Sequence, residues 1–203
     1  MNSAQRSPAP MIAAGRKLFV AGVLVVAMVA IAAAYFSRTW RADAPAASLI
    51  GGAFELTATD GRVIADVDMK GEPFLVFFGY THCPDVCPAT LSEISDVLAK
   101  MPGKPIKALF ITVDPERDTP AIMKDYVSNF DPRIIGLTGD RPAIEKVERA
   151  YRVYARKAPQ DNGDYTMDHS AIVYLMDAKG RFVEAFNLDR KPEESAKELE
   201  GYL

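Results

Sequence analysis

Cysteine and histidine are scarce in this chain. Its 203 residues include two cysteines, Cys83 and Cys87, and two histidines, His82 and His169. A framework of one disulfide is too sparse to hold a domain of this size together, which excludes a cysteine-stapled scaffold. The stretch GYTHCPDVCP at 79–88 places both cysteines in a loop bracketed by prolines. We therefore expect the pair to carry chemistry: disulfide exchange, a peroxidase reaction or metal binding.

Basic residues are few in the larger part of the chain. Five of the 24 lysines and arginines precede residue 44, as does one of the 27 acidic residues, which leaves 19 basic against 26 acidic residues and a net charge near −7. This charge argues against nucleic acid as a partner, because such partners require a basic surface. A basic protein or a cation is a better match, as a partner, for this negative charge.

Residues 18–36, LFVAGVLVVAMVAIAAAYF, contain no charged residue and are long enough to cross a bilayer as a helix. We interpret them as a membrane anchor, with a cytoplasmic tail at 1–17, a linker at 37–50 and an exported domain at 51–203. The alternative is a cleaved signal peptide, since Ala42-Asp43-Ala44 resembles a cleavage site, but its apolar core usually has about 7–15 residues. The early start of the anchor leaves little room for a transit peptide, so we expect a single-pass protein of a bacterial inner membrane, its C-terminal domain in the periplasm.

The exported part is predicted to alternate strands and helices. Apolar patterning and turn signals predict strands at 54–57, 62–64, 73–78, 106–113, 134–137, 171–176 and 182–186, and helices at 88–101, 120–130, 141–154 and from about 192. Asp60-Gly61 indicates that the first two strands form a hairpin. The order is typical of an α/β fold, in which ligands bind beyond the carboxyl ends of the strands. The cysteines follow one such end.

The cysteine loop is predicted to favour thiolates. Pro88 suits the first turn of a helix, so we expect the helix to begin there with Cys87 near its cap, where amides and the helix dipole lower the thiol pKa. The spacing C-x-x-x-C is one residue longer than the C-x-x-C of thioredoxin-type dithiols. A disulfide remains open, but the wider loop can also direct both sulfurs at a third centre.

His169 is the candidate for a third ligand. It immediately precedes the strand at 171–176, and in a thioredoxin-like arrangement the entry to that strand lies beside the active-site helix. Two thiolates and one imidazole favour copper(I), with copper(II) or zinc as alternatives, whereas a structural zinc site normally takes four ligands. The competing interpretation is a loop histidine hydrogen-bonded to Asp168. His82, next to Cys83, is expected to point away.

The other polar residues near these motifs have simpler interpretations. Asp85 and Asp168 are candidate hydrogen-bond acceptors that orient the ligands, although Asp85 is more simply a loop carboxylate. In the segment DPERDTP at 114–120, Asp118 and Thr119 are expected to accept hydrogen bonds from the amides of the following helix.

Four separated motifs resemble the Sco/SenC family: GYTHCPDVCP, VDPERDTP at 113–120, AYRVY at 150–154 and DYTMDHS at 164–170. The resemblance covers the exported part, including GGAFELTATDG at 51–61, and the N-terminal anchor. It implies a thioredoxin-like fold and one copper per domain, bound by Cys83, Cys87 and His169. It also implies that copper is delivered to the binuclear copper centre of cytochrome c oxidase subunit II.

Two hypotheses follow from these residues. The first is a membrane-anchored copper metallochaperone, which is not an enzyme and needs a periplasmic copper donor and thiol reductant as partners. The second is a thiol-disulfide oxidoreductase or redox sensor that uses Cys83 and Cys87. His169 separates the two, because an oxidoreductase has no need of it. A peroxidase ranks third, since no P-x-x-x-T-x-x-C pattern precedes either cysteine.

Overall fold

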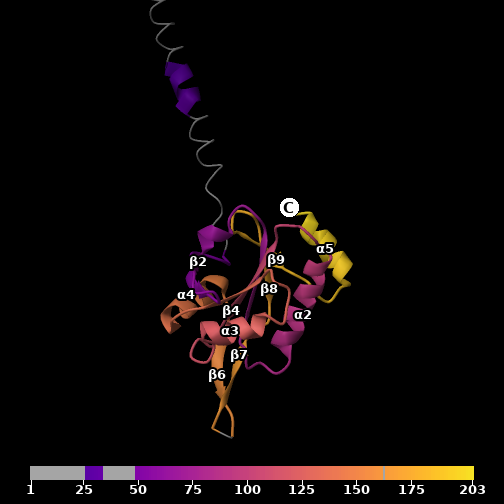
Figure 1. Cartoon of the computed structure of the whole chain (residues 1–203). Helices are drawn as coiled ribbons and strands as arrows, with labels where there is room; N and C mark the ends of the chain where they lie inside the picture. The colour runs from indigo at the N-terminus through magenta and orange to yellow at the C-terminus, as the bar shows by residue number, and fades with distance from the viewer. Residues whose placement is uncertain (1–25, 34–48, 162) are drawn as a thin grey trace, which may run out of the picture. The chain divides into compact units, whose positions relative to one another are not determined.

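The structure is a computed structural model that describes residues 26–33, 49–161 and 163–203 (Figure 1). Ser48–Leu203 form one unit of the chain, separate from Met1–Ala47. The predicted tail at 1–17 and most of the predicted anchor and linker lie outside the described residues. The described part of the anchor, 26–33, is helical. Among the described residues no helix has both the length and the apolar character needed to cross a membrane.

A mixed sheet of seven strands forms the centre of the domain, in the order β2-β1-β5-β4-β3-β8-β9. Its middle strands β3, β4 and β5 are parallel, and β8 runs antiparallel to β3. All six residues of β3 are buried, as expected for a strand covered on both faces. The five strands of this sheet that follow β1 and β2 in the chain are β3 (Phe74–Gly79), β4 (Lys107–Thr112), β5 (Ile134–Thr138), β8 (Val173–Met176) and β9 (Phe182–Ala185).

The predicted N-terminal hairpin is present as β1 (Glu55–Ala58) and β2 (Val63–Ala65), followed by a short 3-10 helix, η1 (Asp66–Met69). The two strands pair in antiparallel fashion around the Asp60-Gly61 turn, where Gly61 has a φ of 84°. β1 also pairs with β5 through Thr57 and Thr138. The hairpin therefore extends the main sheet.

Helices cover both faces of the sheet. On one face, the Phe110 ring of β4 packs against Phe77 and against Tyr126 of a helix, with ring centroids 6.0 and 5.7 Å apart. On the other, Phe78 packs against Tyr151, 5.4 Å away. Two of the helices, α2 and α5, lie side by side (Figure 1). The helices are α2 (Val86–Ala99), α3 (Pro120–Val127), α4 (Arg141–Tyr151) and α5 (Pro192–Glu200).

A second, two-stranded sheet was not predicted. It consists of β6 (Ala155–Pro159) and β7 (Tyr165–His169), and β7 occupies a segment expected to be a loop. The predicted helix at 141–154 ends earlier, at Tyr151, because Arg152 adopts a left-handed conformation with a φ of 57°. The β6–β7 pair, called the ribbon below, is largely exposed. Its residues therefore lack the alternation of apolar and polar side chains that indicates a strand.

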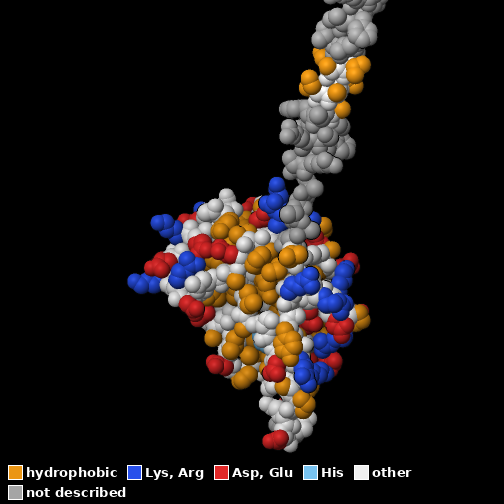
Figure 2. Space-filling view, turned by 180° about the vertical axis from the view of Figure 1, so that it is seen from behind, with side chains coloured by type: hydrophobic (Ala, Val, Ile, Leu, Met, Phe, Trp, Pro, Cys, Tyr) orange, Lys and Arg blue, Asp and Glu red, His pale blue; other side chains and the backbone are white. Residues whose placement is uncertain are grey.

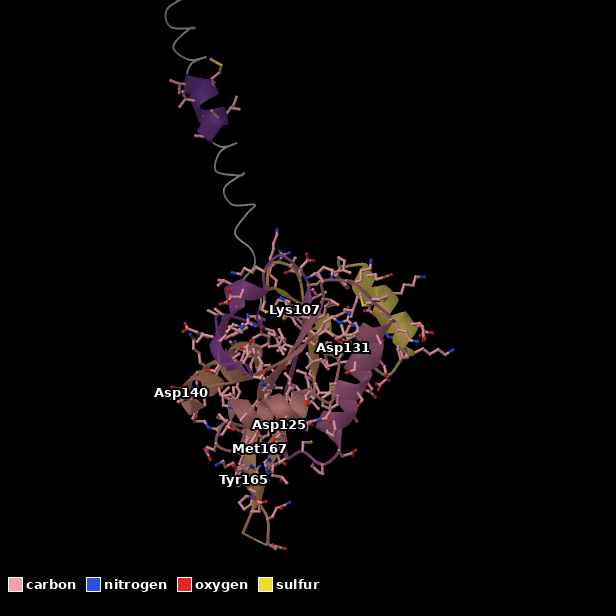
Figure 3. The ribbon with its side chains drawn as sticks, in the orientation of Figure 1. Lys107, Asp125, Asp131, Asp140, Tyr165 and Met167 are labelled. Carbon is pink, nitrogen blue, oxygen red and sulfur yellow. The ribbon has the colours of Figure 1, made fainter. Side chains whose placement is uncertain are left out.

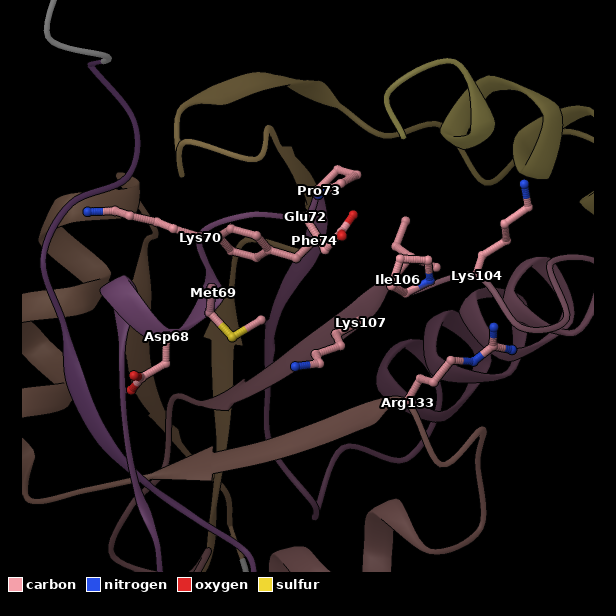
Figure 4. Close-up of a pocket in the computed structure, with 11 residues that line it drawn as sticks. Asp68, Met69, Lys70, Glu72, Pro73, Phe74, Lys104, Ile106, Lys107 and Arg133 are labelled. Atoms are coloured by element: carbon pink, nitrogen blue, oxygen red, sulfur yellow. The ribbon is translucent and has the colours of Figure 1, made fainter.

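The two ends of the sheet differ in chemistry. Tyr165 and Met167, on the β6–β7 ribbon, lie at the end of the domain toward which β3 runs, and Lys107 lies at the opposite end (Figure 3). A cavity of about 200 Å³ at the Lys107 end is bordered by Lys70, Lys104 and Arg133 (Figure 4). Neither a thiol nor an imidazole lines this cavity. The candidate site therefore lies at the other end.

Candidate metal centre

The dithiol loop connects the carboxyl end of β3 to α2. The helix begins at Val86, with Asp85 as its N-cap residue, two residues earlier than the predicted start at Pro88. Pro88 still lies in the first turn, where a missing amide hydrogen costs nothing. Cys87 is consequently the second residue of the helix rather than its cap.

The structure brings together the three predicted ligands. One donor atom from each of Cys83, Cys87 and His169 lies within 4.8 Å of the others. The Cys87 sulfur is 3.5 Å from Nε2 of His169, and the Cys87 amide donates a hydrogen bond of 3.4 Å to the Cys83 sulfur. Both cysteines are free thiols.

His169 is held so that one ring nitrogen faces the sulfurs. Its Nδ1 lies 3.0 Å from the carbonyl oxygen of Ser170, an acceptor, so Nδ1 carries the proton and Nε2 keeps its lone pair. Ser170 is itself fixed to Tyr154 by two hydrogen bonds, of 2.9 and 3.1 Å. The Tyr80 ring packs edge-on against the imidazole, with centroids 5.7 Å apart. The imidazole is therefore oriented before any metal arrives.

Gly79, the last residue of β3, leaves the space that the Cys87 thiol occupies. A Cβ atom at this position would lie 2.8 Å from the Cys87 sulfur and 2.8 Å from the Phe110 ring. Both distances are well below van der Waals contact, so any side chain here would displace the thiol. Sequence reasoning did not identify this residue as part of the site.

Asp118 holds the start of the dithiol loop in place through hydrogen bonds. Its buried carboxylate accepts hydrogen bonds from the amide and hydroxyl of Thr81, at 3.1 and 2.6 Å, and from the hydroxyl of Thr112, at 2.6 Å. The prediction that Asp118 caps the next helix was wrong, since the α3 amide of Ile122 is bound by Thr119 alone. Burial raises the pKa of Asp118, and its three hydrogen bonds oppose that rise.

The predicted low pKa of Cys87 was also wrong. Its side chain is fully buried, and this desolvation raises the pKa of the thiol well above its ordinary value. A hydrogen bond from the Tyr80 backbone acts in the opposite direction, as a smaller effect. The position near the helix start does not compensate for the loss of water. In the metal-free protein Cys87 is thus a neutral thiol that must lose its proton when a metal binds.

Other residues singled out from the sequence lie apart from this group. Asp85 and Asp168 are exposed, and within the described residues neither carboxylate has a hydrogen bond to a candidate ligand. His82 is half exposed, with its Nδ1 beside the Thr81 hydroxyl at 3.1 Å, and it is not one of the three grouped donors.

Arg117 fastens the ribbon that carries His169. Its guanidinium donates to Asp114, at 2.5 Å, and on the ribbon side to the Asp164 carboxylate at 3.2 Å and the Tyr165 carbonyl at 3.0 Å. It also stacks 3.8 Å from the centre of the Tyr165 ring, and the Tyr165 hydroxyl donates to Asp114. The ribbon is thereby tied to the loop that follows β4, although its own surface is exposed.

Comparisons with known proteins agree with this geometry. The family model SCO1/SenC matches residues 42–203. The bovine protein SCO2 homolog, mitochondrial, is 44% identical over 148 residues, which are 70% of this chain and 56% of that protein, so the chain spans little more than half of it. The structure of Bradyrhizobium japonicum ScoI with copper bound is 58% identical, with a TM-score of 0.74 over 76% of this chain and 99% of that one.

A second solved structure, that of yeast Sco1 with copper bound, is 34% identical, with a TM-score of 0.69 over 75% of this chain and 87% of that one. The family match covers well over half of the sequence, including the hairpin, the dithiol loop and the segment that ends at His169. The sheet and helices of this chain are arranged as in these two copper-bound proteins. The chain belongs to the SCO1/SenC family.

Proposed function

We propose that this protein is a copper metallochaperone whose residues Cys83, Cys87 and His169 bind one copper ion and pass it to another protein. The observation that carries the proposal is the convergence of three donor atoms within 4.8 Å. A metal held at about 2.0–2.3 Å by sulfur and imidazole nitrogen separates two of its ligand atoms by at most about 4.6 Å. The free protein therefore needs only a small closure to bind the ion.

The donor set selects the metal. Two sulfurs and one imidazole are soft ligands that favour copper(I), and a structural zinc site would require a fourth ligand that the group does not contain. The related Bradyrhizobium and yeast proteins are copper-bound. Because Cys83 and Cys87 must be reduced to bind copper(I), oxidation of the pair to a disulfide would prevent loading.

The recipient that we propose is cytochrome c oxidase subunit II, at its binuclear copper centre. Membership of the SCO1/SenC family supports this recipient. We further propose that residues 18–36 anchor the protein in a bacterial inner membrane with the domain in the periplasm, where a copper donor and a thiol reductant serve it. The alternative role as a thiol-disulfide oxidoreductase is less favoured, because the imidazole of His169 converges on the two sulfurs, where a metal needs it and disulfide exchange does not.

Copper titration of the reduced domain, residues 48–203, tests the proposal. The related Bradyrhizobium structure consists almost entirely of this region, which supports its folding alone. We expect one copper(I) per domain in competition with a chromophoric chelator, and an affinity lowered by about tenfold or more in His169→Ala. His82→Ala is the matched control, since it removes the other histidine and should leave the affinity unchanged. Equal affinities for His169→Ala and the parent would contradict the three-ligand site.

A further inference from the structure

Tyr80 joins the two parts of the candidate metal centre. It follows Gly79, the last residue of β3, and it begins the dithiol loop three residues before Cys83. Its carbonyl oxygen accepts a hydrogen bond of 3.3 Å from the Cys83 amide, and its own backbone donates one to the Cys87 thiol. Its ring, by contrast, packs against His169 at the end of the ribbon. The backbone of Tyr80 therefore supports the two sulfurs, and its side chain supports the imidazole.

The Tyr80 side chain is a rigid support. It is 3% exposed, and its backbone continues directly from a strand that is buried along its whole length. Such a ring keeps one orientation, because neighbouring side chains fill the space around it. The His169 imidazole meets this ring at a centroid distance of 5.7 Å and an interplanar angle of 89°, the edge-to-face geometry that aromatic pairs prefer. The ring therefore limits how far the imidazole can tilt.

The imidazole needs this second support. The hydrogen bond from its Nδ1 to the Ser170 carbonyl fixes one side of the ring of His169, about which the ring can still tilt. A tilt moves Nε2, on the far side of the ring, away from the Cys87 sulfur that lies 3.5 Å from it. Contact with Tyr80 opposes that movement, so the two supports together keep the nitrogen lone pair at the sulfurs.

The ribbon also needs a support at this end. Its tip projects from the rest of the domain (Figure 2), and Arg117 binds the ribbon near the other end of β7, at Tyr165. At the His169 end, the backbone of Met167 forms a hydrogen bond with the Tyr80 hydroxyl. Tyr80 therefore contacts the last three residues of β7 at two points, through its ring and through its hydroxyl.

We infer that Tyr80 is the positioning residue that makes His169 a ligand. With the aromatic ring in place, Nε2 stays beside the two sulfurs; without the ring, the imidazole tilts away and the site keeps two sulfur donors. The inference rests on the proposed function and deepens it, because it assigns control of the third ligand to a residue that does not itself bind the metal. It requires that the side chain of Tyr80 affect copper binding through His169.

A double-mutant cycle on the 48–203 domain tests the inference. Tyr80→Leu removes the ring but keeps an apolar side chain, His169→Ala removes the ligand, and a third variant carries both changes. Competition with a chromophoric chelator gives the copper(I) affinity of each variant, and urea unfolding gives its stability. Phe74→Leu is the matched control, since it removes a buried ring from the opposite end of β3.

We expect Tyr80→Leu to lower the copper(I) affinity by about tenfold, as is typical of residues that orient a metal ligand, and by no more than His169→Ala does. In the His169→Ala background the same substitution should change the affinity by less than about twofold, because no imidazole is left to position. Phe74→Leu should bind copper(I) as the parent does, whatever stability it loses. An equal loss from Tyr80→Leu in both backgrounds, or no loss in either, would overturn the inference.

Tyr80→Phe separates the ring from the hydroxyl. It keeps the ring, so we expect its copper(I) affinity to lie within about threefold of the parent. A loss as large as that in Tyr80→Leu would contradict the role of the ring. Parental affinity in His169→Ala would instead refute the three-ligand site of the proposed function, and failure of the parent to bind copper would refute that function itself. These failures are therefore distinguishable.

Proton NMR of the parent domain supplies a readout without mutation. Copper(I) is diamagnetic, so nuclear Overhauser contacts between the ring protons of Tyr80 and His169 can be recorded without and with the metal. We expect these contacts in both spectra, because the ring holds the imidazole before and after the metal binds. Their disappearance on loading would overturn the inference, and this measurement decides the matter if Tyr80→Leu fails to fold.

Discussion

Glu148 on α4 should make the stability of this domain depend on pH in a direction opposite to that of most carboxylates. Its side chain is 9% exposed, and its Oε1 has no hydrogen-bond partner among the described residues. Burial is the main cause that raises the pKa of this carboxyl from 4.5 to about 7, and the nearby Arg141 opposes the rise. The folded state therefore favours the protonated, neutral form.

The sign and size of the effect follow from linkage between protonation and folding. Below pH 4.5 the group is neutral in the folded and unfolded chains, and it costs nothing. Between pH 4.5 and 7 the Glu148 carboxyl ionises in the unfolded chain but stays protonated in the folded one, so the free energy of unfolding falls as the pH rises. The loss is complete above pH 7. At about 1.4 kcal/mol for each tenfold difference in proton affinity, the difference between 4.5 and about 7 is worth up to about 3 kcal/mol.

Glu148→Gln removes this cost because the amide cannot ionise. We expect the variant to exceed the parent by up to about 3 kcal/mol at pH 8 in urea unfolding of the 48–203 domain, and to match it within about 0.5 kcal/mol at pH 4. For a domain of this size, that gain raises Tm by roughly 6–12 °C. Glu93→Gln, at an exposed position on α2, is the control and should leave the pH profile unchanged. Parallel pH profiles for Glu148→Gln and the parent would refute the reasoning.

Three further predictions concern the metal centre. Gly79→Ala should destabilise the domain by about 1–3 kcal/mol and weaken copper(I) binding, measured by unfolding and chelator competition, since its methyl group meets the Cys87 sulfur at 2.8 Å; parental affinity would show that the thiol can move freely. Asp118→Asn should weaken copper(I) binding severalfold. Both carboxylate oxygens of Asp118 accept hydrogen bonds, and the substitution replaces one of them with an NH₂ group that cannot accept. Proton NMR should show a shifted Thr81 amide, and an unchanged amide shift would count against Asp118 as a residue that holds the dithiol loop. Arg117→Lys keeps the charge but loses the stacking and the forked hydrogen bonds, so amides of β6 and β7 should exchange faster and copper(I) affinity should fall; unaltered exchange would exclude Arg117 as the fastener of the ribbon.

The buried parts of the fold could be predicted because their signals are local. The run from Pro73 to Phe78 reads as a buried strand whatever surrounds it, and Thr119-Pro120 marks the start of α3 by chemistry within one helical turn. The β6–β7 ribbon had no such signal. Its strands mix charged residues, a proline and small side chains, and they are stabilised by contacts from Arg117 and Glu116, both outside the ribbon. Tertiary contacts decided its structure.

The candidate ligands could be predicted for a different reason. The sequence has only two thiols and two imidazoles, so few ligand sets were possible, and the order of the strands placed Cys83, Cys87 and His169 at one end of the sheet. Their electrostatics could not be predicted in the same way. The pKa of Cys87 depends on how completely the folded chain excludes water from it, and a helix start that would lower the pKa in an exposed loop is outweighed by that burial.

The residues that position the ligands share a property that explains why the sequence does not reveal them. Gly79 acts by the absence of a side chain, Asp118 reaches a loop 37 residues earlier in the chain, and Arg117 reaches a ribbon 47 residues later. Each one acts only through a contact made after folding, and none carries chemistry of its own toward the metal. Two ligands therefore lie on a loop fixed from within the core, whereas the third lies at the end of a largely exposed ribbon that Arg117 ties to the loop after β4. Since a weaker attachment allows larger displacements at lower cost, His169 is the ligand whose position we expect to vary most when the metal leaves.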